Sequence, residues 1–157
     1  MQDISINSTI IIHEATRNLI KKVWDSLTPE ELSTIPKDHK NNILWNIGHC
    51  IVTQQLLIYA LSNNEMTLPP SFIEKFRKGS SPANGEISES DIEIINENLM
   101  SQSAKLKEDY EKLLNSDFKE YETSYGVKLS NVNDAISFNN VHEALHLGII
   151  MSLKKHI

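Results

Sequence analysis

The chain has 157 residues and a mass of 17.9 kDa, with 39% hydrophobic and 23% charged residues. This composition excludes a disordered or collagen-like chain, and the length is that of one globular domain, so we expect a single domain over residues 1–157. The formal net charge of −6, without a long basic block, argues against nucleic acid as a partner.

The chain contains a single cysteine, which excludes an internal disulfide and fits a reducing compartment. The first residues lack the basic region and apolar run of a signal peptide, and no stretch approaches about 18 unbroken apolar residues. We therefore expect a soluble cytoplasmic protein that has no membrane partner.

Four segments have helical periodicity, and residues that break the pattern separate them: 8–27, 41–62, 90–114 and 133–157. In the first segment, Ile12, Leu19 and Val23 form a stripe that we expect to face the core. In the third, Ser90 and Glu93 have the spacing of a capping box, which predicts the start of that helix.

Of the long connections between these helices, one has a predictable structure and another does not. Residues 65–87 form a connection of about 23 residues, which is long for a compact domain, and we expect a short helix at 71–78. Residues 115–133 could hold an extended stretch or a short hairpin, and the pattern does not decide. Four amphipathic helices without a convincing strand predict an all-α four-helix bundle, a fold that builds metal sites between facing helices.

The histidines of the second and fourth helices have the spacing of a metal site. His142 and His146 are four residues apart, so they lie on one helix face about one turn apart, and we expect that face to lie at the seam of the bundle. His49 occupies the middle of an apolar stripe on the second helix. Three neutral imidazoles are typical of catalytic zinc sites that keep one position open, although hydrogen-bonded core histidines are the alternative.

We expect other roles for the remaining histidines. His13, beside Glu14 and Arg17, is expected on a solvated or interface surface, and His39 is expected to be exposed. His156 lies ten residues beyond His146, about 15 Å along a continuous helix, and is too far away to share an ion with it.

The string "HEALH" at 142–146 also matches the H-E-x-x-H motif of zinc peptidases. The extended form of that motif needs Gly at position 149 and His at position 152, where this chain has Ile149 and Ser152, and no acidic residue follows Glu143. The sequence therefore argues against a peptidase. We expect Glu143, which points about 100° away from His142, to be solvated or to support the ligands from behind.

The segments "WNIGHCIVTQQLL" and "HEALHLGIIMSLKK" together resemble the DinB-like (DinB/YfiT) superfamily of metalloproteins, and the resemblance covers nearly the whole chain. It implies an up-down-down-up four-helix bundle, commonly a homodimer, with a divalent metal, often zinc or nickel, held by His49, His142 and His146. Relatives include thiol S-transferases and a mycothiol-dependent maleylpyruvate isomerase. Many members have Gln where this chain has Ile149, which puts inherited substrate chemistry in doubt.

These observations lead to a hypothesis and two alternatives. The hypothesis is a metal-dependent transferase or hydrolase acting on a small molecule, with a thiol-dependent S-transferase using a low-molecular-weight thiol as one form. The alternatives are a non-catalytic metal-binding or stress-response protein and a purely structural bundle. Trp45 could line the pocket or belong to the core, and Cys50 is expected to be a small buried side chain. Gln54 and Gln55 are expected to be exposed, with ligand support as the alternative.

Overall fold

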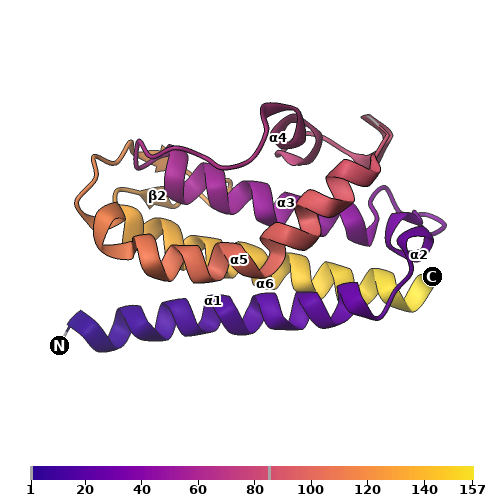
Figure 1. The fold of residues 1–157 in the computed structure, drawn as a ribbon, viewed down its shortest axis with the longest axis horizontal. Coiled ribbons are helices and arrows are strands. Elements are labelled where there is room, and N and C mark those ends of the chain that lie inside the picture. Colours follow the sequence, from indigo (N-terminus) through magenta and orange to yellow (C-terminus); the bar gives the residue numbers. More distant parts are fainter. Residues whose placement is uncertain (1, 85) are drawn as a thin grey trace.

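The computed structural model describes the backbone of residues 2–84 and 86–157, and the side chains of residues 8–83 and 86–157. The chain is mostly helical, which confirms the expected all-α class (Figure 1). In chain order the elements are α1 (Gln2–Asp25), α2 (Pro29–Ser33), α3 (Ile43–Gln54), η1 (Gln55–Ala60), α4 (Pro70–Phe76), η2 (Pro82–Asn84), α5 (Glu89–Leu114), β1 (Tyr121–Glu122), β2 (Lys128–Leu129), α6 (Val132–Leu153) and η3 (Lys154–His156).

Side-chain caps fix where several helices begin. Asn42 and Asn131 accept hydrogen bonds at the first turns of α3 and α6, and Thr28 forms a capping box that starts α2, a helix the sequence pattern did not predict. The capping box of α5 is formed by Ser88 and Asp91, two residues earlier than predicted. Asp91 also receives a hydrogen bond from Lys75 of α4, a tertiary contact that sequence spacing does not reveal.

The long helices pack side by side, with α1 and α3 each lying against both α5 and α6 (Figure 1). The predicted core stripe of α1 is wrong for Ile12 and Leu19, which are 55% and 49% exposed, whereas Val23 is partly buried and packs against the core. The buried stripe of α1 is instead Ile10, His13, Arg17, Ile20 and Trp24. These residues also recur at helical spacing, but two of them are polar, so hydropathy alone favoured the other face.

The short helix predicted at 71–78 is present as α4, and residues 121–129 form the hairpin that the sequence left open, with Tyr121 opposite Leu129. The second predicted helix is α3 followed directly by η1, a turn of π-helix. Such turns widen a helix locally and are frequent at functional sites. Within the described residues, every helix is too short or too polar to serve as a membrane span.

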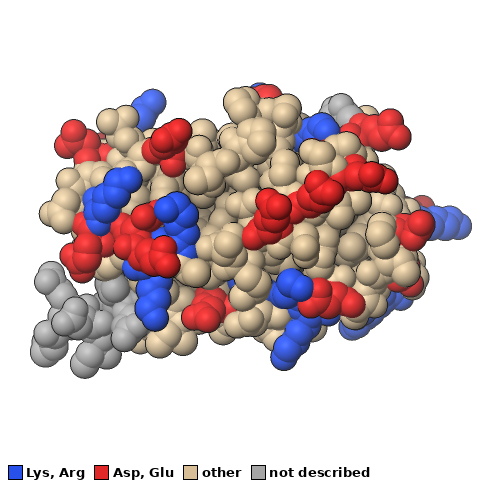
Figure 2. Space-filling view, viewed as in Figure 1, with Lys and Arg blue, Asp and Glu red and all other residues tan. Residues whose placement is uncertain are grey.

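Surface charges contribute little to this fold. Figure 2 shows acidic and basic side chains interspersed on one face, with uncharged residues between them. Several exposed pairs are local, such as Arg77 with Glu74 and Lys128 with Glu120. Because exposed ion pairs contribute only about 0–1 kcal/mol, the stability of the fold rests on the buried core.

Gly48 allows α4 to pack against α3. A Cβ atom at this position would lie 2.4–2.8 Å from atoms of the Phe76 ring, which is closer than van der Waals contact allows. Phe76 is fully buried and ends α4. The absence of a side chain at Gly48 therefore sets the distance between the two helices.

We predict that Gly48→Ala lowers the free energy of unfolding by about 1–3 kcal/mol, because overpacking outweighs the better helix propensity of alanine. Gly148→Ala on α6 is the matched control: a Cβ there meets nothing within 4 Å. The control should raise stability by about 0.5–1 kcal/mol. Chemical denaturation measures both changes, and equal effects of the two variants would contradict the proposed close contact.

Candidate metal centre

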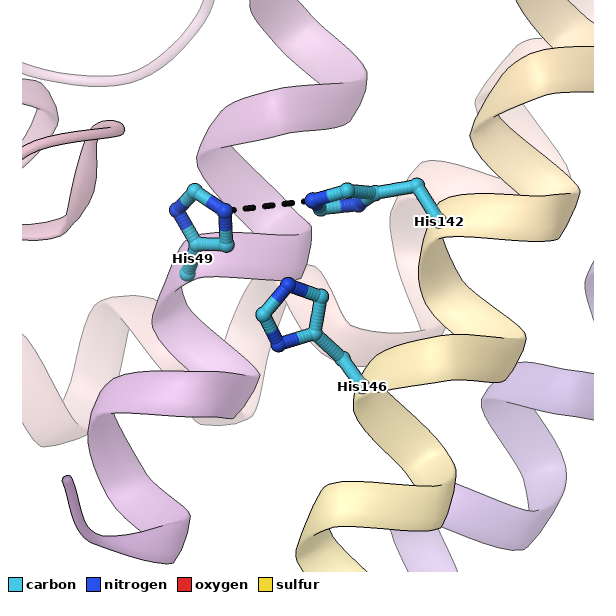
Figure 3. A group of neighbouring side chains, drawn as sticks. All are labelled: His49, His142 and His146. Carbon is cyan, nitrogen blue, oxygen red and sulfur yellow. Dashed lines mark hydrogen bonds between the residues drawn. The ribbon is translucent and has the colours of Figure 1, made fainter. Parts of the chain in front are cut away.

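His49, His142 and His146 lie together, as Figure 3 shows. His49 projects from α3 and the other two from α6, and one nitrogen from each ring lies within 4.8 Å of the others. The Nε2 atoms of His49 and His142 are 3.1 Å apart. Two nitrogens bound to one tetrahedral ion at 2.0–2.1 Å would be separated by about 3.4 Å. The spacing of these two nitrogens therefore fits a shared cation, and His146 lies close enough to be a third ligand.

The second nitrogen of two of these rings is already hydrogen-bonded. His49 Nδ1–H donates to the carbonyl oxygen of Phe76 at 2.6 Å, and His146 Nδ1–H donates to Asn46 Oδ1 at 2.7 Å. The amide of Asn46 is itself oriented, because its Nδ2 donates to the Asn42 carbonyl at 2.8 Å. In a neutral ring the proton then lies on Nδ1, and Nε2 keeps a lone pair that can bind a metal. Metal-binding histidines are commonly fixed in this way, by a hydrogen bond from the nitrogen that does not bind the metal.

His142 differs from the other two because its Nδ1 atom is buried with no hydrogen-bond partner among the described groups. The tautomer of His142 is therefore not fixed by a hydrogen bond at Nδ1. The ligand that occupies the Nε2 side therefore decides which nitrogen of His142 carries the proton.

Burial keeps this cluster in its neutral form. Desolvation, together with the charges of neighbouring histidines, lowers the pKa of His142 to about 3 and that of His146 to about 4. The pKa of His49 is also lowered by burial, although its bond to the Phe76 carbonyl acts in the opposite direction. Because metal ligands must be deprotonated, protons compete weakly for these nitrogens at neutral pH.

Trp45 packs against the cluster from the buried side. The Trp45 ring stacks on His49 at 4.7 Å, and its Nε1–H donates to Ser80 Oγ at 3.1 Å. Trp45 is not part of the pocket wall, so the core interpretation holds.

Cys50 is fully buried, as expected, and burial raises the pKa of its thiol well above the usual range. A buried, protonated thiol is a poor nucleophile.

A pocket with a volume of about 490 Å³ opens beside the three histidines. The π-helical turn η1, the β1–β2 hairpin and α6 supply most of its wall. Thr53 lies at the inner end, with Oγ1 3.5 Å from His49 Nε2. The hairpin residues of this wall were not predicted, because their sequence carries no chemical motif.

Glu143 faces away from this pocket and is fully buried, so the expectation of a solvated side chain is wrong. Its two oxygens accept from Arg17 Nε and Nη2, both at 2.8 Å, and Oε1 also accepts from His13 Nε2 at 3.2 Å and Asn139 Nδ2 at 3.0 Å. Burial alone raises the pKa of Glu143, but the charge of Arg17 and the bonds from His13 outweigh it and hold the pKa below the ordinary value. The carboxylate of Glu143 is therefore ionised, and both of its oxygens accept hydrogen bonds.

The same network corrects other expectations. His13 is not solvated but fully buried, with Ser103 Oγ 2.9 Å from its Nδ1. Gln54 and Gln55 are also buried: Gln54 accepts from Arg17 Nη2 at 2.7 Å, and Gln55 accepts from the backbone of Thr67 at 2.9 Å. Among the described residues, neither side chain forms a hydrogen bond to the three histidines. His39 is exposed, as predicted.

The network could have been found from one signal in the sequence. His13 and Arg17 are four residues apart and continue with Ile20 and Trp24 at helical spacing, as do Asn139 and Glu143 on α6. Polar pairs with i, i+4 spacing that continue an apolar stripe are candidates for buried, mutually paired groups. The bonds to Asn46 and Phe76, by contrast, depend on tertiary geometry.

We predict strong coupling between Arg17 and Glu143. Arg17→Met or Glu143→Gln alone should each cost about 3–5 kcal/mol, because each leaves an unpaired buried charge. The double variant should cost clearly less than the sum, since no lone charge remains. Denaturant unfolding of the four proteins measures the coupling, and additive effects would contradict a buried ion pair.

We also predict that the metal-free protein loses stability as the pH falls from about 7 to about 5. The pKa values of His142 and His146 are about 4 or lower in the folded state. In the unfolded state they return to about 6.5, so acid favours the unfolded chain by about 1–2 kcal/mol per histidine at pH 5. Unfolding in a chelating buffer measures this, and His142→Gln should reduce the slope. An unchanged slope would contradict the prediction.

The comparisons with known proteins identify the family. No curated protein matches the chain. The sequence model of the DinB superfamily matches residues 12–150, a range that contains the three clustered histidines and Glu143. Because this match covers most of the sequence, the chain belongs to the DinB superfamily.

Proposed function

We propose that His49, His142 and His146 hold a divalent metal ion, zinc or nickel, and that the protein is a metal-dependent transferase or hydrolase acting on a small molecule. A thiol-dependent S-transferase that uses a low-molecular-weight thiol is one form of this activity. The observation that carries the proposal is the hydrogen-bonding of the rings. The Nδ1 atoms of His49 and His146 each form a hydrogen bond that fixes the orientation of the ring. This orientation directs the Nε2 atoms of both rings toward a common point beside the pocket.

A divalent ion at this point would lower the pKa of a thiol or water brought to it. The residues of the chain have separate tasks. Phe76 and Asn46 hold two of the rings in the tautomer that presents Nε2, and the pocket wall surrounds the reacting groups with mainly apolar side chains. The Thr53 hydroxyl, near His49 Nε2, is placed to hydrogen-bond a molecule in the pocket.

Glu143 has no acid–base task in this proposal. In zinc peptidases the glutamate of H-E-x-x-H faces the metal-bound site and acts as the general base. Here both carboxylate oxygens are bonded to Arg17 in the interior of the bundle, and the side chain is fully buried. A molecule in the pocket cannot transfer a proton to it.

We further propose the up-down-down-up topology, a homodimer and a cytoplasmic location. In Figure 1, α1 and α6 run in one direction and α3 and α5 in the other, which supports the topology. A second copy would cover the large apolar side chains exposed on α1 and α6, two helices that pack against each other. These side chains are Ile11, Ile12, Leu19, Val141 and Met151. The cytoplasmic location rests on the sequence alone.

We predict that the purified protein binds about one equivalent of zinc or nickel per chain, as three-histidine sites do. His49→Ala, His142→Ala and His146→Ala should each abolish stoichiometric binding. Asn46→Ala should weaken it by about 10- to 100-fold, because it releases the ring of His146. Elemental analysis and competition with a chromogenic chelator measure these effects. Cys50→Ala, at the residue next to His49, is the matched control and should retain the metal.

The same preparations test catalysis. The metal-loaded protein should conjugate a small thiol to an electrophile or hydrolyse a small ester or amide, and the activity should disappear on chelation and return with metal. Stoichiometric metal without turnover of thiol, ester or amide substrates would favour the non-catalytic metal-binding alternative. Absence of metal, together with unchanged stability of His49→Ala, would contradict every metal-based proposal.

A further inference from the structure

The wall of the pocket beyond the histidines is largely apolar. Aliphatic side chains come from η1 and α6, and aromatic rings come from α6 and the hairpin. They are Leu56, Leu57, Ala60, Leu61, Phe138 and Leu145, with Tyr121 and Tyr125. The rings of Tyr125 and Phe138 meet edge to face, with centroids 5.3 Å apart, so they join the hairpin to α6. Such a wall gains free energy by covering apolar surface of a ligand.

Among the described residues, the pocket wall carries a single formal charge, and that charge is positive. No aspartate or glutamate is among the described residues that line it, and Lys78 is its one formally charged side chain. The three candidate ligands are imidazoles, which bind a metal in their neutral form, so they do not compensate the charge of a divalent ion. The nearby carboxylate of Glu143 is paired with Arg17. A pocket that holds a divalent ion is therefore electropositive beside the histidines and apolar over most of the remaining wall.

We infer that the pocket takes an apolar molecule that carries one anionic metal-binding group, such as a carboxylate or thiolate. The anionic group faces the histidines, and the apolar part lies between η1, the hairpin and α6. The assignment of the anionic end rests on the proposed metal site, whereas the assignment of the apolar part rests on the pocket wall alone. Ligands that are cationic or carry several charges do not match this wall, because their charges would be desolvated without a partner.

A series of straight-chain carboxylates tests both parts. Butanoate, hexanoate and octanoate are titrated by calorimetry into the zinc-loaded protein, and octylamine and octanol serve as head-group controls. Affinity should rise about fourfold per methylene, the factor that corresponds to burying one methylene group, and the heat-capacity change should be negative. Octanoate should bind more tightly than octanol, and octylamine should bind most weakly.

Two pairs of variants locate the site. Ala60 lines the pocket and Ala104 on α5 does not, although both are exposed. Ala60→Phe should fill the pocket and weaken octanoate by about tenfold or more, the loss expected when several methylenes lose their contacts. Ala104→Phe should have no effect. Lys78→Gln should weaken octanoate but not octanol, and Lys37→Gln, at an exposed lysine outside the pocket, is its control.

The outcomes separate this inference from the proposed metal site, because metal content is measured independently. The expected result in metal-free protein is a smaller preference for octanoate over octanol, because Lys78 remains, with the chain-length dependence retained. A protein that binds no metal but still shows the chain-length dependence, abolished by Ala60→Phe, overturns the metal site and keeps the apolar pocket. Affinity independent of chain length, equal effects of Ala60→Phe and Ala104→Phe, or a preference for octylamine overturns the inference.

Discussion

The bundle depends on one buried ion pair, between Arg17 of α1 and Glu143 of α6. The guanidinium also donates to the Leu99 carbonyl and the Gln102 side chain of α5 and to Gln54 of α3, so one side chain connects all four long helices. Taking both charges out of water is costly, and only a nearly complete set of hydrogen bonds offsets this cost. Few other arrangements of the helices would satisfy the pair, which gives the interior a specific geometry.

This constraint also determines where the candidate metal centre lies. Glu143 follows His142 directly, so fixing its side chain toward Arg17 fixes the rotation of α6 about its axis. His142 and His146 then face α3 and the pocket, where His49 meets them. The side chains of the segment "HEALH" thus point to two different sides of α6. Its histidines form part of a candidate metal site, and its glutamate holds the helix in place.

The second half of the site depends on close packing around α3. Gly48 lets Phe76 approach, and the Phe76 carbonyl then accepts the hydrogen bond that orients His49. The long connection between α3 and α5 therefore has a structural task, because α4 lies within it. After α3, the π-helical turn η1 places several apolar side chains on the pocket wall. Rigid elements, rather than flexible loops, position the inner end of the site, as a metal site requires.

Helical periodicity and i, i+4 spacing are local properties of the chain, so the sequence predicted the all-α class, the approximate positions of the long helices and the three histidines that come together. It predicted the wrong buried face of α1, a solvated His13 and exposed Gln54 and Gln55, because hydropathy assigns polar side chains to the surface. The burial of His13, Gln54 and Gln55 follows from tertiary packing, because their hydrogen-bond partners lie far away in the chain. The hydrogen bonds of His49 and His146 and the hairpin wall of the pocket depend on the same long-range packing, which no local pattern encodes.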